Sequence, residues 1–194
     1  MSAHAVRSCE PGDVAACLAI SNRAAAETAA NFALEPEPLD LWQAEHAATR
    51  GTHPWFVAEA DGRVVGFARA SRWKGRCAYA WAVETTVYVD PAHHGRGIGR
   101  ALYGALFDAL RRQGYHRAIA GITLPNDASV ALHEAFGMRQ VACFEAIGWK
   151  FGRWHDVGYW MADLQPPGTP PQDLRAFDAG NARGSRIADG DHRS

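Results

Sequence analysis

The feature that most constrains the fold is a glycine-rich segment, residues 93–100, which joins an apolar stretch ending at Asp90-Pro91 to a helical pattern. Glycines allow the backbone to approach a bound group, and unpaired N–H groups at the start of a helix point outward. The helix dipole adds about 0.3 to 1 kcal/mol to each anionic contact there. The segment therefore predicts either a loop that binds an anion such as a pyrophosphate, or a tight strand-to-helix turn without a ligand.

The helix after this segment is indicated by apolar residues that recur at intervals of four and so share one helical face. Gly114 is a typical helix end. Two other phosphate-binding motifs are excluded, because the spacing does not fit a Rossmann fingerprint and no Gly-Lys-Ser/Thr of a Walker loop is present. The apolar residues are Ile98, Leu102, Leu106 and Leu110.

Strand and helix patterns are mixed along the rest of the chain. Asp61-Gly62 tolerates positive φ angles and predicts a hairpin turn between two strands. Early hairpins followed by strand-helix-strand units predict an α/β (α+β) fold, in which helices cover a mixed sheet. The expected strands are residues 6–9, 55–60, 64–70, 79–89, 118–123, about 139–149 and 157–164, and the expected helices are residues 10–31, 39–49, 97–113 and 128–136.

Composition divides the chain into two parts. Its 194 residues, 47% of them hydrophobic, are enough for one domain with a sizeable core, which we expect at residues 1–164. Residues 165–194 are rich in Pro, Gly, Asp and Arg and can bury little apolar surface. We expect a flexible and dispensable tail there, although its first prolines could lie against the domain.

Charge and cysteine content exclude several classes of function. With 20 basic and 21 acidic residues the chain has no broad basic field, so we expect no nucleic-acid or membrane partner. The four cysteines form no Cys-x-x-Cys pair, which argues against a zinc site or a redox dithiol, and we expect no metal. The first residues lack the pattern of a secretory signal, and we therefore expect a cytoplasmic protein.

Several motifs together resemble the GNAT acyltransferase superfamily in order and spacing. They are Val87-Tyr88-Val89-Asp90-Pro91, His94-x-x-Gly97-x-Gly99, Asn126-x-x-Ser129 and Leu132-His133-Glu134-x-x-Gly137. The resemblance implies the GNAT fold, with a mixed, mostly antiparallel central sheet flanked by helices, and acetyl-CoA as acyl donor. His94 departs from the superfamily, which usually has Gln or Arg there. The implied cofactor-binding residues are Val87, Val89, His94, Gly95, Arg96, Gly97, Ile98, Gly99, Arg100, Asn126 and Ser129.

A closer likeness, from about residue 6 to 164, is to phosphinothricin N-acetyltransferases. It rests on the pattern Trp73-Lys74-x-Arg76-x-Ala78-Tyr79-x-Trp81-x-x-Glu84-x-Thr86, on Leu124-Pro125-Asn126-Asp127 and on Gly152-x-Trp154-His155-Asp156. This resemblance implies acetylation of the α-amino group of a glutamate-like amino acid: phosphinothricin, methionine sulfoximine or methionine sulfone. It also implies herbicide resistance, which need not be the physiological role, and a homodimer in which late strands meet.

The chemistry requires a base, because a free amino acid carries a proton on its nitrogen at neutral pH. Glu84 lies in an apolar strand that should raise its pKa above the usual value of about 4.3, and the resemblance makes it the general base. The alternative is a solvent-facing strand residue. The resemblance makes His133 the acid that protonates the leaving thiolate, although a helical histidine often only packs. It also implies that the backbone N–H of Val89 stabilises the thioester oxygen.

Asn126 is expected to cap the next helix, and by resemblance also to bind the pantetheine arm of the cofactor. Lys74 and Arg76 are candidate cations for the acceptor's carboxylate or phosphinate, or else belong to a solvated loop. Phe32, Tyr79 and Thr86 complete the implied substrate-binding set. The rival functions are acetylation of another small amine and a non-catalytic module that binds acyl-CoA.

Overall fold

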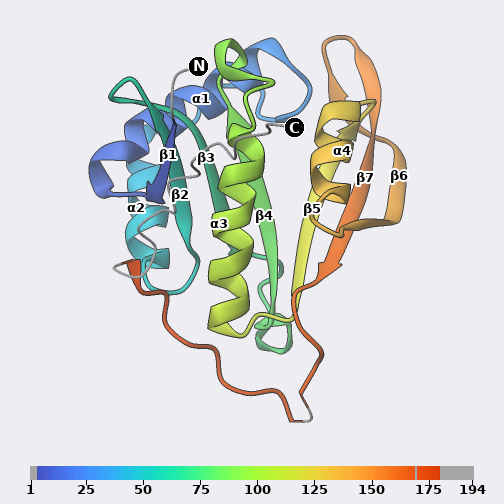
Figure 1. Cartoon of the computed structure of the whole chain (residues 1–194). Helices are drawn as coiled ribbons and strands as arrows, with labels where there is room; N and C mark the ends of the chain where they lie inside the picture. Colours follow the sequence, from blue (N-terminus) through green and yellow to red (C-terminus); the bar gives the residue numbers. More distant parts are fainter. Residues whose placement is uncertain (1–3, 169, 180–194) are drawn as a thin grey trace, which may run out of the picture.

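The computed structural model describes residues 4–168 and 170–179, which fold into one seven-stranded sheet with helices on both faces (Figure 1). None of the helices in these residues is long and apolar enough to cross a membrane. The strands are β1 (Ala5–Ser8), β2 (Trp55–Ala60), β3 (Arg63–Arg72), β4 (Ala82–Val89), β5 (Arg117–Leu124), β6 (Arg139–Lys150) and β7 (Arg153–Asp163). The helices are α1 (Val14–Glu27), α2 (Leu39–Thr49), α3 (Ile98–Gln113) and α4 (Asp127–Glu134), with single 3-10 turns at Pro11–Asp13, Cys77–Tyr79 and Pro91–His93.

The sheet order is β1-β2-β3-β4-β5-β7-β6, and only the β4–β5 pair is parallel. That pair is short, because it joins only residues 82–84 of β4 to residues 117–119 of β5. Beyond it the two strands diverge, as Figure 1 shows between the green and yellow strands. A mixed, mostly antiparallel sheet flanked by helices is the predicted fold class, and the gap between β4 and β5 positions the site.

Two hydrophobic cores lie on opposite faces of the sheet. Successive residues of a strand point to opposite faces, and in β2 Phe56 belongs to the core under α3 while Val57 belongs to the core under α1 and α2. The apolar face predicted for α3 is buried: Ile98 is 2% exposed, and Leu102, Leu106 and Leu110 are fully buried.

Local sequence signals predicted where most of the helices and strands begin and end. Asp61 and Gly62 have φ angles of 51° and 72°, as the predicted two-residue hairpin requires, and Gly97 and Gly114 bound α3 with φ of 75° and 98°. Two ends differ from expectation. The first helix stops at Glu27 rather than near residue 31, because Thr28 is extended and caps the carbonyl of Ala24. The strand expected from Tyr79 begins at Ala82, because residues 77–79 form a 3-10 turn.

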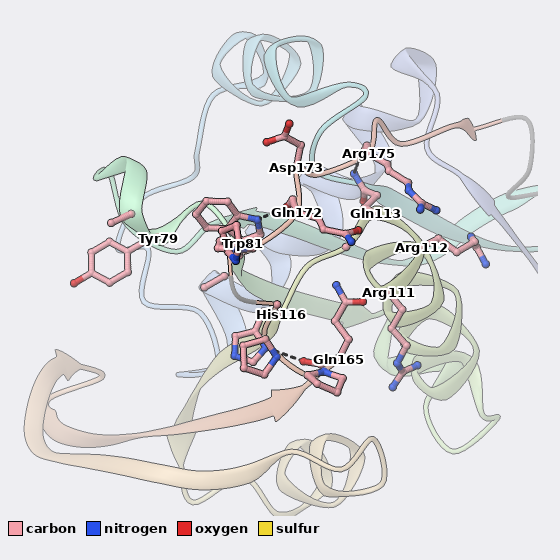
Figure 2. A pocket seen from close by; sticks show the side chains of 18 residues that line it. Tyr79, Trp81, Arg111, Arg112, Gln113, His116, Gln165, Gln172, Asp173 and Arg175 are labelled. Atoms are coloured by element: carbon pink, nitrogen blue, oxygen red, sulfur yellow. Dashed lines mark hydrogen bonds between the residues drawn. The ribbon is translucent and has the colours of Figure 1, made fainter.

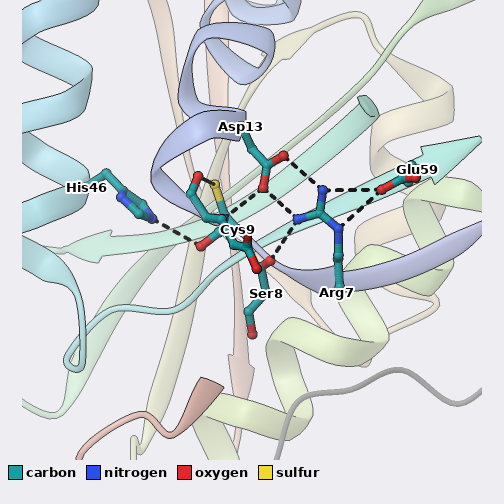
Figure 3. A network of polar contacts seen from close by, with 7 residues as sticks. Arg7, Ser8, Cys9, Asp13, His46 and Glu59 are labelled. Atoms are coloured by element: carbon teal, nitrogen blue, oxygen red, sulfur yellow. Dashed lines mark hydrogen bonds and ion pairs between the residues drawn. The ribbon is translucent and has the colours of Figure 1, made fainter. Parts of the chain in front are cut away.

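Strand β1 is fixed by an ion-pair network (Figure 3). Arg7 donates to both carboxylate oxygens of Asp13, at 2.6 and 2.9 Å, and to Glu59 at 3.2 Å. Burial alone would raise the pKa of Asp13, but the hydrogen bonds from Arg7 and the backbone of Glu10 lower it below its usual value. His46 donates to the carbonyl of Cys9 at 3.3 Å. These contacts join β1 to β2, to the 3-10 turn before α1 and to α2, away from the gap between β4 and β5.

The described part of the expected flexible tail packs on the domain. The Phe177 ring meets Phe56 edge to face at 5.7 Å, and Leu174 also contacts the core. Hydrogen bonds run from Trp81 to the carbonyl of Gln172 and from the Arg175 and Phe177 amides to the domain. Residues 172–177 therefore differ from the expectation of a flexible tail, because their apolar and backbone groups have partners far away in sequence. Residue 169 and residues 180–194 of the expected tail lie outside the described residues.

Candidate active site

The diverging strands β4 and β5 open into a cleft of about 900 Å³. It is walled by β4, by the loop before α3, by the end of β5 with the start of α4, and by the segment between α1 and α2. The cleft brings most of the predicted site residues together. Those on its surface are Phe32, Glu84, Thr86, Val87, Val89, His94, Gly95, Gly97, Ile98, Gly99, Asn126, Ser129 and His133; Lys74, Arg76, Tyr79, Arg96 and Arg100 are not among them.

The glycine-rich loop has the geometry of an anion cradle. Gly95 and Gly97 have φ angles of 73° and 75°, and a Cβ added to either would meet no atom within 4 Å, so the loop faces open space. Helix α3 starts directly after it, with the outward N–H groups of a helix N-terminus. The ring of His94 donates through Nε2 to the carbonyl of Val89 at 2.8 Å and so holds the loop to the end of β4.

Strand β4 presents backbone donors to the cleft. The amide of Asp90 hydrogen-bonds the carbonyl of Val65 in β3, and the β3–β4 register is continuous from residue 83 to 89. Backbone groups alternate in direction along a strand. The N–H groups of Val87 and Val89 therefore point away from β3, into the gap left by β5.

Glu84 lies in the cleft where β4 and β5 part. Burial raises the pKa of Glu84 above its usual value, although the charges of Lys74 and then Arg69 act in the opposite direction. Its carboxylate makes no hydrogen bond to another residue within the described ranges, so its oxygens are available. A half-buried carboxylate with a raised pKa and free oxygens suits proton abstraction near neutral pH.

His133 is buried and engaged at both ring nitrogens. Its Nδ1 lies 2.7 Å from the carbonyl oxygen of Ser129, which can only accept, so Nδ1 carries the proton. Its Nε2 lies 2.7 Å from the hydroxyl of Tyr103, which is itself 3.4 Å from the hydroxyl of Thr85. Burial lowers the pKa of His133, while the hydrogen bond to Ser129 acts in the opposite direction. Nε2 of neutral His133 thus accepts a hydrogen bond from the Tyr103 hydroxyl, and both residues line the cleft.

Asn126 caps α4, as predicted, because its side-chain oxygen accepts from the amide of Ser129 at 3.2 Å. The cap is also on the cleft surface. The local sequence could indicate the cap, whereas the cleft position depends on the packing of α4 against α3 through the Tyr103–His133 pair.

The candidate acceptor residues separate into two groups. Phe32 and Thr86 line the cleft, and the ammonium of Lys74, stacked on Trp73 at 4.8 Å, lies close enough to affect Glu84. Tyr79 lines a second cavity of about 740 Å³, beside Trp81 and the packed tail (Figure 2).

Arg69 and Tyr103 are among the cleft residues that sequence reasoning missed. Arg69 stacks on Trp42 and Trp55, each at 4.7 Å, and donates to Glu45 at 2.6 Å. An arginine in an otherwise apolar strand was the available signal for it. Tyr103, on the buried face of α3, gave no signal distinct from packing. Within the described residues no three His, Cys, Asp or Glu side chains are grouped so as to hold a metal ion.

Splayed strands with free backbone donors, a glycine cradle at a helix start and a half-buried carboxylate define a site for transfer of an acyl group from a phosphate-bearing donor. The family model described as the acetyltransferase (GNAT) family matches residues 19–138. The chain belongs to the GNAT family of acetyltransferases, as its motifs predicted.

Individual relatives extend the likeness over most of the chain. A phosphinothricin N-acetyltransferase from Streptomyces viridochromogenes is 41% identical over 170 residues, covering 88% of this chain and 92% of its own. An L-methionine sulfoximine/L-methionine sulfone acetyltransferase from Salmonella typhimurium is 36% identical, covering 85% and 97%. The structure of a putative acetyltransferase from Salmonella typhimurium with its cofactor acetyl-CoA superimposes with a TM-score of 0.83 at 35% identity, covering 88% and 98%.

Proposed function

We propose that this enzyme transfers the acetyl group of acetyl-CoA to the α-amino group of a small glutamate-like amino acid, such as phosphinothricin, methionine sulfoximine or methionine sulfone. The observation that carries the proposal is the position of Glu84, a half-buried carboxylate with a raised pKa at the floor of a cleft built for a phosphate-bearing acyl donor. The names of the relatives support the acceptor class.

The residues of the cradle fit the pyrophosphate of coenzyme A. Gly95 and Gly97 leave room for it, and the first amides of α3 offer hydrogen bonds to its oxygens. Val87, Ile98, Gly99, Asn126 and Ser129 would hold the rest of the cofactor from the cleft walls. Arg96 and Arg100 are not among the residues that line the cleft, and we propose that they contribute through the backbone amides of the loop and of the first turn of α3. When bound, acetyl-CoA supplies an activated thioester.

In the proposed mechanism Glu84 takes a proton from the acceptor's ammonium group, directly or through one water, and the free amine attacks the thioester carbonyl. The N–H of Val89 then donates to the developing oxyanion, a contribution of about 3 to 4 kcal/mol where such donors have been measured in other enzymes. Collapse breaks the carbon–sulfur bond, and the thiolate takes a proton. We propose that His133 first takes up a proton from solvent at Nε2; the Tyr103 hydroxyl then gives its own proton to the thiolate and receives the Nε2 proton, which returns His133 to its neutral form.

Acceptor recognition is proposed to rest on Lys74 and Arg76 as cations for the carboxylate and the side-chain anion, with Phe32 and Thr86 as walls. The influence of Lys74 on Glu84 supports its closeness to the reacting amine. For Tyr79 only the family resemblance supports a role in acceptor binding, because this residue borders the second cavity.

We also propose that the enzyme is a cytoplasmic homodimer that associates through the β6–β7 hairpin. Strand β6 is at the edge of the sheet, and the hairpin carries apolar side chains that are 43–59% exposed. An apolar edge of this kind favours association with a second copy. The unpaired cysteines suit a reducing compartment. The exposed side chains are Val141, Phe144, Ile147, Trp149, Phe151 and Trp154.

The test is release of free coenzyme A thiol with phosphinothricin, methionine sulfoximine, methionine sulfone and a polyamine as acceptors. We expect turnover with the amino acids and a loss of at least about a hundredfold in kcat for Glu84→Gln, with acetyl-CoA affinity by calorimetry unchanged. Glu134→Gln, an exposed change outside the cleft, is the matched control. Turnover only with the polyamine would identify another amine as acceptor. Acetyl-CoA binding without turnover on any amine would favour a binding module.

A further inference from the structure

Lys150, the last residue of β6, is a buried ammonium group without an acidic partner. The residue is 5% exposed, and none of the ion pairs found in the described residues involves it. Its Nζ donates to three backbone carbonyl oxygens, those of Ala25 at 2.5 Å, Asn31 at 2.6 Å and Ala33 at 2.8 Å. An ammonium group has three N–H donors, so all of them are used. Burying a charge is costly unless such partners compensate it.

The three carbonyls belong to one stretch of chain. Ala25 is in the last turn of α1, where carbonyl oxygens lack helical partners and the helix dipole favours a cation. Asn31 and Ala33 flank Phe32 in the irregular segment between α1 and α2, residues 28–38, which we term the acceptor segment. Lys150 is more than a hundred residues away in sequence, with separations of 117 to 125. Its ammonium group thus ties both neighbours of Phe32 to the end of α1.

The ring of Phe32 is fixed from the other side by the β6–β7 hairpin. A Cβ at Gly148 would lie 2.4 Å from that ring, so the ring occupies the space that only glycine leaves free. The ring also lies against His155, at a centroid distance of 6.0 Å, and His155 donates through Nε2 to the carbonyl of Lys150 at 3.0 Å. Held in this way, Phe32 is part of the cleft wall that also contains Glu84.

We propose that Lys150 is a positioning residue for the acceptor amino acid: by holding the carbonyls on both sides of Phe32, and with Gly148 behind the ring, it sets the wall against which the acceptor is oriented toward Glu84. Lys150 itself does not touch the acceptor, because its three donors are occupied. The inference rests on the proposed function. The acceptor segment has further attachments: the Tyr88 hydroxyl donates to the carbonyl of Ala30 at 3.0 Å, and the side chain of Asn31 donates to the Ser21 hydroxyl at 3.0 Å. Two reciprocal hydrogen bonds join Glu37 to Asn22. Loss of Lys150 therefore releases the carbonyls on both sides of Phe32, while the rest of the segment stays attached.

The first experiment is steady-state kinetics of the full-length Lys150→Met variant, in which an unbranched side chain of similar length replaces lysine and the ammonium group is removed. We expect the KM of the acceptor to rise at least about tenfold, in line with the loss of hydrogen bonds to a charged group, while acetyl-CoA affinity stays within about twofold. Arg139→Met, which removes an exposed cation from the same strand, should change neither value. An unchanged acceptor KM in a folded Lys150→Met enzyme would overturn the proposal.

A second variant and a double-mutant cycle separate positioning from general stability. Gly148→Ala displaces the Phe32 ring while leaving the ammonium in place, and should also raise the acceptor KM selectively. In a Phe32→Ala background, Lys150→Met should add little, because the group through which it acts is gone. Full additivity in that background, or a normal acceptor KM for Gly148→Ala, would refute the idea. Gly148→Ala also keeps the test decisive should Lys150→Met not fold.

The hold of Lys150 on the acceptor segment, which we term the clamp, and the proposed function can be tested separately. Amide hydrogen exchange of the wild-type and Lys150→Met proteins requires no substrate, and we expect faster exchange confined to residues 29–36. Faster exchange there, together with no turnover on any amino acid, would remove the proposed function and leave the clamp. Unchanged exchange in that segment would remove the clamp whatever the enzyme acetylates.

Discussion

Replacing Tyr103 by phenylalanine removes the hydroxyl group of a buried hydrogen bond beside the cleft. Tyr103 is fully buried, and its hydroxyl is 2.7 Å from Nε2 of His133. Its ring contacts with Phe107 and Phe136 do not involve that oxygen and should persist. The substitution therefore leaves Nε2 of His133 as a buried acceptor without its donor, because Nδ1 already faces the carbonyl of Ser129.

The cost follows from that orphaned acceptor. Leaving a buried polar group unsatisfied costs about 1 to 3 kcal/mol, and for a domain of this size each kcal/mol lowers the melting temperature by about 2 to 4 °C. We expect Tyr103→Phe to melt about 2 to 12 °C below the wild type. Tyr115→Phe is the matched control, because Tyr115 is also buried but its acceptor, the carbonyl of Thr52, keeps a hydrogen bond from Gln113 at 2.7 Å.

Thermal or urea unfolding of both variants measures the difference. The reasoning fails if Tyr103→Phe costs no more than Tyr115→Phe. The same variant tests the proposed proton path, in which the proton that reaches the thiolate from His133 passes through the Tyr103 hydroxyl. Tyr103→Phe should then lower kcat about as much as His133→Ala does. A normal kcat in Tyr103→Phe would exclude this route for the proton.

Two further predictions concern the charge near the base and the tail. Removing the ammonium in Lys74→Met should raise the pKa of Glu84 further, because Lys74 stabilises the carboxylate. Since the base must be deprotonated, the acidic limb of the pH profile of kcat/KM should move to higher pH. A limb that stays in place or moves to lower pH would contradict this prediction. The limb should not move in Arg139→Met, measured over the same pH range. Ending the chain after Leu164 should cost about 1.5 to 3 kcal/mol of unfolding free energy, the value of half-burying Leu174 and Phe177, with acetyl-CoA affinity unchanged. Equal urea midpoints for the full and shortened chains would contradict the packed tail.

Features with local causes could be predicted from the sequence. The face of α3 follows from apolar residues four apart, and the Asp61-Gly62 turn and the Asn126 cap follow from side-chain or backbone preferences within a few residues. The aromatic stretch before β4 shows the limit of this reasoning. Tyr79 has a strand-forming side chain, yet it lies in a 3-10 turn, because the amides of Tyr79 and Ala80 bond the carbonyls of Arg76 and Cys77.

Features with distant causes could not be predicted. The partner of His133 is 30 residues away on another helix, and the carbonyls held by Lys150 are at separations of 117 to 125. The packing of Phe177 on Phe56 likewise depends on how the tail folds back onto the sheet, which composition does not indicate. Each of these residues has a plain local interpretation, as a packing histidine, a surface lysine or a tail residue. Only the assembled sheet brings their partners within reach.

The two walls of the cleft differ in this respect, and the difference bears on specificity. Apart from Asn126 and Ser129, the wall proposed to bind the cofactor is one stretch of sequence, from Val87 through the glycine loop to the start of α3, so it depends mainly on local geometry. The opposite wall is assembled from the acceptor segment, held by Lys150, and from the β6–β7 hairpin behind Phe32. Because its shape depends on long-range contacts, small changes there can move Phe32 without disturbing the cradle. Changes of acceptor preference should therefore arise from residues 28–38 and 148–155, while changes in residues 87–100 should affect all acceptors alike.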